Sequence, residues 1–259
     1  MTSKLKDLMY PLATAAAVIL VWQLSIQFFH IPSYVLPTPL SVLRALETGY
    51  IGGVFWQHLA YTMTSTIIGY VVGCGLAILV GALVSESEVA EKLVHPLIIA
   101  LQSMPKVALA PLILVWFGFE MKSKVIMVAL VCFFPVFVNT IVGLKQTNPA
   151  MVDMAKAISA SRWMIFWEIK LPSAAGHIFA GLQIAIVLSL IGAVVAEFVS
   201  SSRGLGYLIN SAAVTLEVNV MFAALVSLAV LGIVGTQLVR YAHRKLIFWE
   251  GNLSSTVKE

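Results

Sequence analysis

The protein has 259 residues, of which 60% are hydrophobic and only 11% are charged. An ordinary soluble domain carries about 25% charged residues, so this composition excludes a disordered chain, a disulfide-bonded scaffold and most soluble folds. Both cysteines, Cys74 and Cys132, lie in apolar runs, and no catalytic residue set or metal site is predicted. The net charge of +4 is attributed to basic residues in loops at a membrane surface rather than to nucleic-acid binding.

Long stretches of the chain contain no Asp, Glu, Lys or Arg, and these are residues 8–43, 48–85, 125–144, 171–196 and 218–239. About 20 consecutive apolar residues are enough for a helix to cross the ~30 Å hydrocarbon core of a membrane. The sequence therefore predicts an all-α polytopic membrane protein. Its six expected transmembrane helices cover residues 10–29, 59–84, 93–117, 124–144, 176–199 and 218–240.

The third predicted helix contains residues that disturb a regular span. Pro96, Pro105 and Pro111 each remove a backbone donor, and Lys106 lies near its middle. A lysine at the centre of a membrane helix costs roughly 2.5–3.5 kcal/mol, so Lys106 is not expected to face lipid. It either lines a cavity, where it could meet an anionic substrate, or pairs with a carbonyl freed by Pro105 or Pro111, or lies at a subunit interface.

The loops give the orientation. With a cytoplasmic N-terminus, eleven basic residues would face the cytoplasm and four would face the outside. The eleven are Lys4, Lys6, Lys92, Lys145, Lys156, Arg162, Lys170, Arg240, Arg244, Lys245 and Lys258. The four are Arg44, Lys122, Lys124 and Arg203. This asymmetry predicts that both termini are cytoplasmic. The expected organisation is a first helix and external connection (1–58), a core (59–242) with a cytoplasmic loop at 145–175, and a cytoplasmic tail (243–259).

The cytoplasmic loop contains a predicted helix over residues 148–163. Asn148 is suited to cap its first turn, and Pro149 is suited to the first helical position. Ala155 and Ser159 are four residues apart, so a helix would place them on one face, where another protein could approach the backbone closely. The alternative is a passive interfacial helix that Trp163 and Trp167 anchor to the membrane.

The loop resembles the "EAA" loop of ABC importer permeases, in which Glu-Ala-Ala is followed by three residues, Gly, nine residues and Ile-x-Leu-Pro. Here the pattern is Asp153-Met154-Ala155, then Ser159, then Ile169-Lys170-Leu171-Pro172. The spacing matches throughout, whereas Asp153, Met154 and Ser159 depart from the pattern. Met154 is the largest of these changes, and it could alter how tightly the loop seats on a partner.

Further segments are similar to permeases of the nitrate, sulfonate and taurine type, and they occur in the same order along most of the chain. They are Leu36-Pro37-Thr38-Pro39, residues 104–112, Trp116-Phe117-Gly118, Ser123-Lys124, Asn139-Thr140 and Gly204-Leu205-Gly206-Tyr207. Permeases for thiamine precursors and aromatic acids are similar as well.

The resemblance implies a type I ABC importer fold in a bacterial inner membrane. Such a permease pairs with a second copy, two cytoplasmic ATPases and an external substrate-binding protein. The residues that the family pattern assigns to ATPase coupling are Asp153, Met154, Ala155, Ser159, Ile169, Leu171 and Pro172. The chain has no G-x-x-x-x-G-K-[ST] motif, so ATP would be used by the ATPase, and no cofactor is expected on this chain.

The translocated substrate is expected to be a small anion of the nitrate, sulfonate or taurine type. A thiamine or pyrimidine precursor and an aromatic carboxylate are the alternatives, and a secondary transporter or channel is a remote one. Candidate pathway residues are Lys106, Asn139, Gln183 and Glu197. The two amides could instead form hydrogen bonds between helices, and Glu197 could be a gate, an interface carboxylate or a snorkelling surface residue. Gly69 and Gly73 are spaced for close helix packing.

Overall fold

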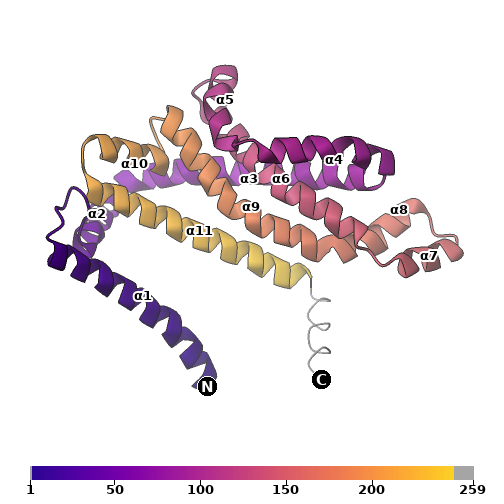
Figure 1. Ribbon diagram of the computed structural model, residues 1–259, viewed down its shortest axis with the longest axis horizontal. Helices are drawn as coiled ribbons and strands as arrows, with labels where there is room; N and C mark the ends of the chain where they lie inside the picture. Colours follow the sequence, from indigo (N-terminus) through magenta and orange to yellow (C-terminus); the bar gives the residue numbers. More distant parts are fainter. Residues whose placement is uncertain (1, 248–259) are drawn as a thin grey trace. The chain divides into compact units, whose positions relative to one another are not determined.

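The computed structural model describes residues 2–247, and these form helices joined by short connections, with no strand among them (Figure 1). The helices are α1 (Thr2–Phe29), α2 (Pro39–Ile51), α3 (Val54–Ser85), α4 (Glu88–Ser103), the 3-10 helix η1 (Lys106–Leu109), α5 (Ala110–Phe117), α6 (Met121–Lys145), α7 (Pro149–Ala157), α8 (Arg162–Ile165), the π-helical turn η2 (Phe166–Lys170), α9 (Leu171–Ser200), α10 (Leu205–Val214) and α11 (Val218–Leu246). The predicted all-α class is therefore confirmed. Of the predicted tail 243–259, the first residues continue α11, and residues 248–259 lie outside the described chain.

Four helical segments of the described chain are long and apolar enough to cross a membrane. They are Val54–Ser85, Met121–Lys145, Arg162–Val199 and Val218–Leu246. They contain the second, fourth, fifth and sixth predicted spans. The first predicted span lies within α1, where Ala13–Phe29 is a shorter apolar helix among the described residues. Four of the six predicted spans therefore meet the length and composition criterion in the described part of the chain.

The prediction of one continuous third helix over 93–117 is wrong. α4 ends at Ser103, Met104 and Pro105 have extended backbone conformations, and the chain resumes as η1 and α5. Pro105 lacks an N–H and disfavours a helical conformation at Met104, which explains the position of the break. By contrast, Pro96 and Pro135 lie inside α4 and α6, and neither ends its helix.

The chain forms two compact units. One consists of the residues up to Tyr61 with Arg203–Leu228, and the other of Thr62–Ser202 with the residues from Ala229 onward. In the first, Val42 of α2, Phe55 of α3 and Ala223 of α11 form a small apolar core. α10 belongs to this unit and was not predicted as a helix. Its entry residue Gly204 has φ +113°, and the Gly204 N–H donates to His58 Nδ1 at 3.1 Å.

The second unit is built around α3, α6 and α9. Its largest core cluster includes Cys74 and Ala77 from α3, Val128 and Phe137 from α6, and Ala185 from α9. The predicted close packing at Gly69 and Gly73 is confirmed. A Cβ on Gly69 would lie 2.5 Å from the Val128 Cβ, and one on Gly73 would lie 2.5 Å from the Ala129 carbonyl oxygen. The missing side chains therefore let the backbones of α3 and α6 approach closely.

Candidate functional site

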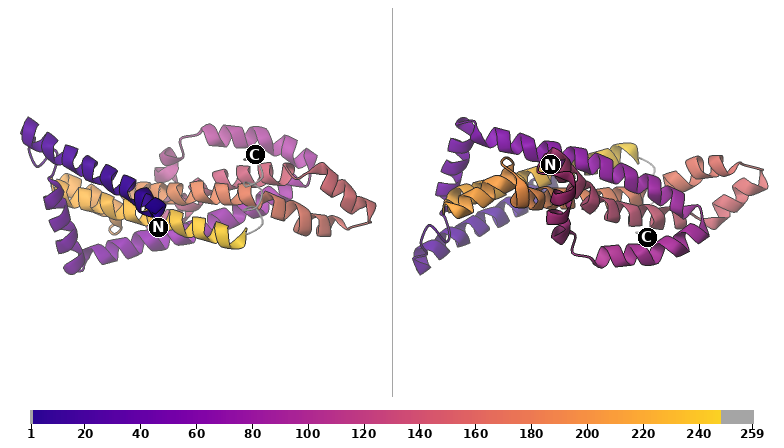
Figure 2. Two further views of the ribbon diagram at one scale, coloured as in Figure 1. Left: turned by 90° about the horizontal axis from the view of Figure 1, so that it is seen from below. Right: turned by 90° about the horizontal axis from the view of Figure 1, so that it is seen from above.

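The loop at residues 145–175 folds into α7 and α8, which extend beyond the ends of α6 and α9 (Figure 2). The start of α7 agrees with the prediction. The Asn148 side chain accepts a hydrogen bond from the Ala150 N–H at 2.9 Å, and Pro149 occupies the first turn, where its missing donor costs nothing. However, α7 ends at Ala157, so the predicted single helix over 148–163 is too long.

Ser159 determines how α7 ends. Its φ of +59° is left-handed, and its N–H donates to the Lys156 carbonyl at 2.9 Å. The Ala160 N–H then reaches back to the Ala155 carbonyl at 3.0 Å. These bonds satisfy carbonyls that the end of a helix would otherwise leave without donors. Glycine adopts this conformation most easily, which gives a physical reason for Gly at this position of the family pattern.

The predicted common face of Ala155 and Ser159 is therefore wrong. Ser159 lies beyond the helix, and Ala155 is only 5% exposed, so it is already covered by this chain. The large apolar side chains that α7 and its C-cap residue expose are instead Met151, Met154 and Ile158, which are 45%, 64% and 76% exposed. Their spacing of three and four residues places them along one side of the helix. The accessible surface of α7 thus includes an apolar ridge, beside the exposed charges of Asp153 and Lys156.

The other residues of the family pattern lie at different places in the loop. Asp153 is exposed, and it accepts a hydrogen bond from Lys156 Nζ at 3.2 Å within α7. Ile169 lies in the π-helical turn η2, and Pro172 lies in the first turn of α9. Leu171 packs against a core cluster of Leu144, Ala174 and Ile178. The Ile-x-Leu-Pro segment therefore lies where the loop joins the membrane helix, whereas Asp153 and Met154 are accessible on α7.

Trp163 of α8 and Trp167 of η2 form a pair. Their ring centroids are 5.3 Å apart at an angle of 62°, and both side chains are exposed. Tryptophan pairs of this kind suit the headgroup region of a membrane. Anchoring of the loop to the membrane by these tryptophans is compatible with an accessible ridge on α7, because the tryptophans and the ridge lie on different helical segments.

Lys106 and Asn139 contact residues of α6. Lys106 begins η1, is partly buried, and places its Nζ 4.8 Å from the centre of the Phe134 ring, a cation–π distance. Asn139 donates to the Pro135 carbonyl of its own helix at 2.7 Å, so this hydrogen bond is not one between helices. Gln183 is partly buried on α9. These three candidates come from the same unit, but the structure does not gather them into one cluster.

Glu197 is 1% exposed, so it is not a snorkelling surface residue. Its carboxylate oxygens lie 2.8 and 3.1 Å from the Thr62 hydroxyl, which donates to them from α3. The carboxylate also interacts electrostatically with Lys124 of α6. Lys124 is 0% exposed, and its Nζ donates to the Phe119 carbonyl at 2.6 Å. The buried carboxylate of α9 is thus hydrogen-bonded by a hydroxyl of α3 and lies within the electrostatic influence of a buried lysine of α6.

A cavity of about 250 Å³ lies among α3, α9 and α11, and its lining includes Thr66, Tyr70, Ile186 and Val234. None of the four predicted pathway residues lines it. Its walls are almost entirely apolar, and the Thr66 hydroxyl has no hydrogen-bond partner within the described chain. This cavity therefore does not bring the predicted polar residues together.

Met151 and Ile158 were not predicted as surface residues of the loop. Lys124 was predicted only as a charge of an external loop, whereas its side chain is buried. The spacing of Met151, Met154 and Ile158 was a usable signal, because apolar residues at i, i+3 and i+7 share a helix face. For Lys124, the signal was its position at the start of a long charge-free run. A basic residue there must be paired or placed at the membrane surface.

Residues 73–248 match the family model of binding-protein-dependent transport system inner membrane components. The chain is 30% identical over 248 residues to an aliphatic sulfonates transport permease of Bacillus subtilis, covering 96% of this chain and 88% of the relative. It is 33% identical over 230 residues to a formylaminopyrimidine transport permease of Halalkalibacterium halodurans, covering 88% of this chain and 91% of the relative. Its fold is similar to that of an amino acid ABC transporter with histidines, with a TM-score of 0.64 at 17% identity over 77% of this chain and 97% of that chain.

The family model covers more than half of this chain, and the relatives are matched over nearly their whole lengths. The apolar spans, the all-helical architecture of the described residues and the helical loop between α6 and α9 agree with that match. The chain therefore belongs to the family of binding-protein-dependent transport system inner membrane components, the permease subunits of ABC transporters.

Proposed function

We propose that this permease forms the translocation pathway of an ATP-driven importer, and that its α7 is the element that docks on a separate ATPase. The observation that carries the proposal is the ridge of Met151, Met154 and Ile158, which is exposed although the helix beneath it is packed through Ala155. An amphipathic helix with apolar anchors at i, i+3 and i+7 suits a hydrophobic groove in a protein partner. Met also adapts its shape to irregular surfaces.

The complete transporter would contain two copies of this chain, two cytoplasmic ATPase subunits that use ATP, and an external substrate-binding protein. The loop and both termini would then be cytoplasmic, as the distribution of basic residues predicts. A reporter that is active only in the cytoplasm should function when fused after Glu259 and should fail when fused near Gly52. The reverse pattern would contradict this orientation.

A second copy of the chain is supported by the outer side of α9. Ile184, Val187 and Ile191 are each about half exposed, and their spacing puts them on one side of the helix. The partly buried Gln183 adjoins this apolar stripe. Cysteine substituted for Ile191 should form crosslinks between copies in membranes if this stripe lies at the subunit interface. A cysteine substituted for Leu79, which is exposed on α3, is the comparison.

The substrate class that we propose is a small anion, such as a sulfonate. The similarity to an aliphatic sulfonates permease supports it, and so does the cationic Lys106, whose charge the Phe134 ring does not neutralise. The similarity to a formylaminopyrimidine permease supports the alternative of a pyrimidine precursor. Uptake of a labelled sulfonate, with unlabelled sulfonate and unlabelled pyrimidine as competitors, separates these two classes.

The docking proposal is tested by two substitutions on the ridge, Met154→Glu and Ile158→Glu. Each places a charge where an apolar groove is expected, and an unpaired charge buried at an interface costs several kcal/mol. The ATPase should therefore be lost when the permease is purified, although the permease itself should insert normally. Met164→Glu is the matched control, because Met164 is similarly exposed but lies on α8.

The passive-anchor alternative predicts the opposite order of effects. In that case Trp163→Ala and Trp167→Ala would impair the protein most, and both ridge variants would retain the ATPase. Normal ATPase retention and uptake in both Met154→Glu and Ile158→Glu would therefore show that α7 is not the docking element.

A further inference from the structure

Two ion pairs connect the ends of the cytoplasmic loop to the segment that joins α3 and α4. Lys170, the last residue of η2 before α9, places its Nζ 2.6 Å from Glu86 Oε1. Lys145, the last residue of α6, pairs with Glu91 in the first turn of α4. The loop between Lys145 and Lys170 carries α7, so its entrance and its exit are both attached to one neighbouring segment.

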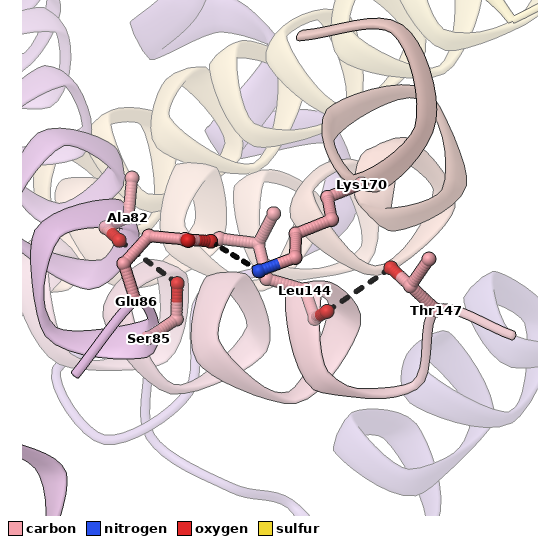
Figure 3. A network of polar contacts seen from close by, with 6 residues as sticks. All are labelled: Ala82, Ser85, Glu86, Leu144, Thr147 and Lys170. Atoms are coloured by element: carbon pink, nitrogen blue, oxygen red, sulfur yellow. Dashed lines mark hydrogen bonds and ion pairs between the residues drawn. The ribbon is translucent and has the colours of Figure 1, made fainter. Parts of the chain in front are cut away.

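Near the pair between Lys170 and Glu86, the last turns of α3 and α6 each carry a side-chain hydrogen bond to the backbone (Figure 3). The Ser85 hydroxyl donates to the Ala82 carbonyl at 2.8 Å at the end of α3, and the Thr147 hydroxyl donates to the Leu144 carbonyl at 3.0 Å at the end of α6. Figure 3 shows Lys170 reaching across to Glu86 between these two helix ends. A displacement of Lys170 is thus opposed by a carboxylate held on an ordered helix end.

α4 packs on the unit through part of its apolar surface. Val94 and Ile98 pack against the core of the unit, whereas Val89, Leu93 and Leu97 are exposed. The pair between Lys145 and Glu91 therefore holds the first turn of α4 directly to the end of α6. α4 leads in turn to the break at Pro105 and to Lys106 on Phe134.

We propose that Glu86 and Glu91 are positioning residues that transmit movement of α7 to α4 through Lys170 and Lys145. The inference rests on the proposed docking of an ATPase on α7. The four side chains are partly exposed, and pairs of this kind contribute little to stability. Their effect is geometric, because two attachments separated along the loop resist rotation of α7 relative to α4, which a single attachment would allow.

Charge reversal and charge exchange test the proposal in the complete transporter in proteoliposomes. Lys170→Glu and Lys145→Glu each turn one attraction into a repulsion, so the amount of substrate imported per ATP hydrolysed should fall several-fold. The exchanged pairs Glu86→Lys with Lys170→Glu, and Glu91→Lys with Lys145→Glu, should restore the ratio. Glu168→Lys is the control, because it reverses a charge beside Lys170 at an exposed carboxylate that makes no ion pair within the described chain.

The readouts separate this proposal from the docking proposal. The charge-reversed variants should retain the ATPase on purification, whereas the ridge variant Met154→Glu should lose it. A wild-type import ratio in both single reversals, or ratios that the exchanged pairs do not restore, would overturn the positioning function of Glu86 and Glu91 while leaving the docking proposal intact. Loss of the ATPase in the single reversals would also overturn it, since the effect would then be on docking rather than on transmission.

Discussion

The Thr62 hydroxyl of α3 and the Glu197 carboxylate of α9 are 135 residues apart in the sequence, yet they meet at 2.8 Å in the interior of the protein. Lys124 of α6 brings an opposite charge to the same carboxylate, and both ionisable side chains are fully buried. A lysine and a glutamate together are tolerated in such a place, because each reduces the cost of burying the other.

Glu197→Leu should therefore destabilise the protein by about 3–5 kcal/mol, since it leaves the Lys124 charge buried without its counter-charge. The double variant Lys124→Met, Glu197→Leu should lose much less, because both buried charges are removed together. The midpoint of thermal unfolding of the purified permease, followed by tryptophan fluorescence, measures both effects. If the double variant is as unstable as the sum of the two single variants, the two charges do not support each other.

Gly73 provides a sharp test of the packing between α3 and α6. A Cβ there would lie 2.5 Å from the Ala129 carbonyl oxygen and 2.7 Å from the Ala129 Cα, and a backbone cannot yield as a side-chain end can. Gly73→Ala should push the two helices apart and lower the unfolding temperature. Gly75→Ala is the matched control on the same helix, because nothing lies within 4 Å of its added methyl group. It should be neutral or slightly stabilising, since Ala favours a helix by about 1 kcal/mol over Gly.

Ser159 adopts the left-handed conformation that ends α7, at a cost of roughly 1–2 kcal/mol for a residue with a Cβ. Ser159→Gly should relieve that strain and keep the ATPase bound. Ser159→Val should loosen the end of α7, because a β-branched residue is strongly disfavoured at positive φ. Hydrogen exchange of the α7 amides gives the order Gly slowest, Ser intermediate and Val fastest. Faster exchange in Ser159→Gly than in the wild type would contradict this account.

Lys106→Met tests whether the ammonium group meets an anionic substrate. The methionine side chain can still pack on the Phe134 ring, so the fold around η1 should be retained while the positive charge is lost. Import of an anionic substrate should fall, and ATPase retention should be unchanged. Lys106→Arg is the control that keeps both the charge and the ring contact. Unchanged uptake in Lys106→Met would restrict Lys106 to holding η1 against α6.

The sequence by itself determined the membrane class, most of the spans and the start of α7. Charge-free runs of about 20 residues have few alternatives to a membrane helix, and the pair Asn148-Pro149 specifies a helix start through local bonding alone. The spacing of Gly69 and Gly73 indicated close packing for the same kind of reason, since only small residues allow two backbones to approach.

Only the tertiary structure decided which side of α7 is covered and which partners the buried charges have. The sequence pattern of α7 is compatible with either Ala155 or Met154 facing outward, and only the folded structure shows that Ala155 is the covered residue. The interactions of Glu197 with Thr62 and Lys124 likewise depend on the rotation and register of three helices. Local helix propensity does not determine the rotation and register of these helices, because both follow from packing that forms only when distant segments come together.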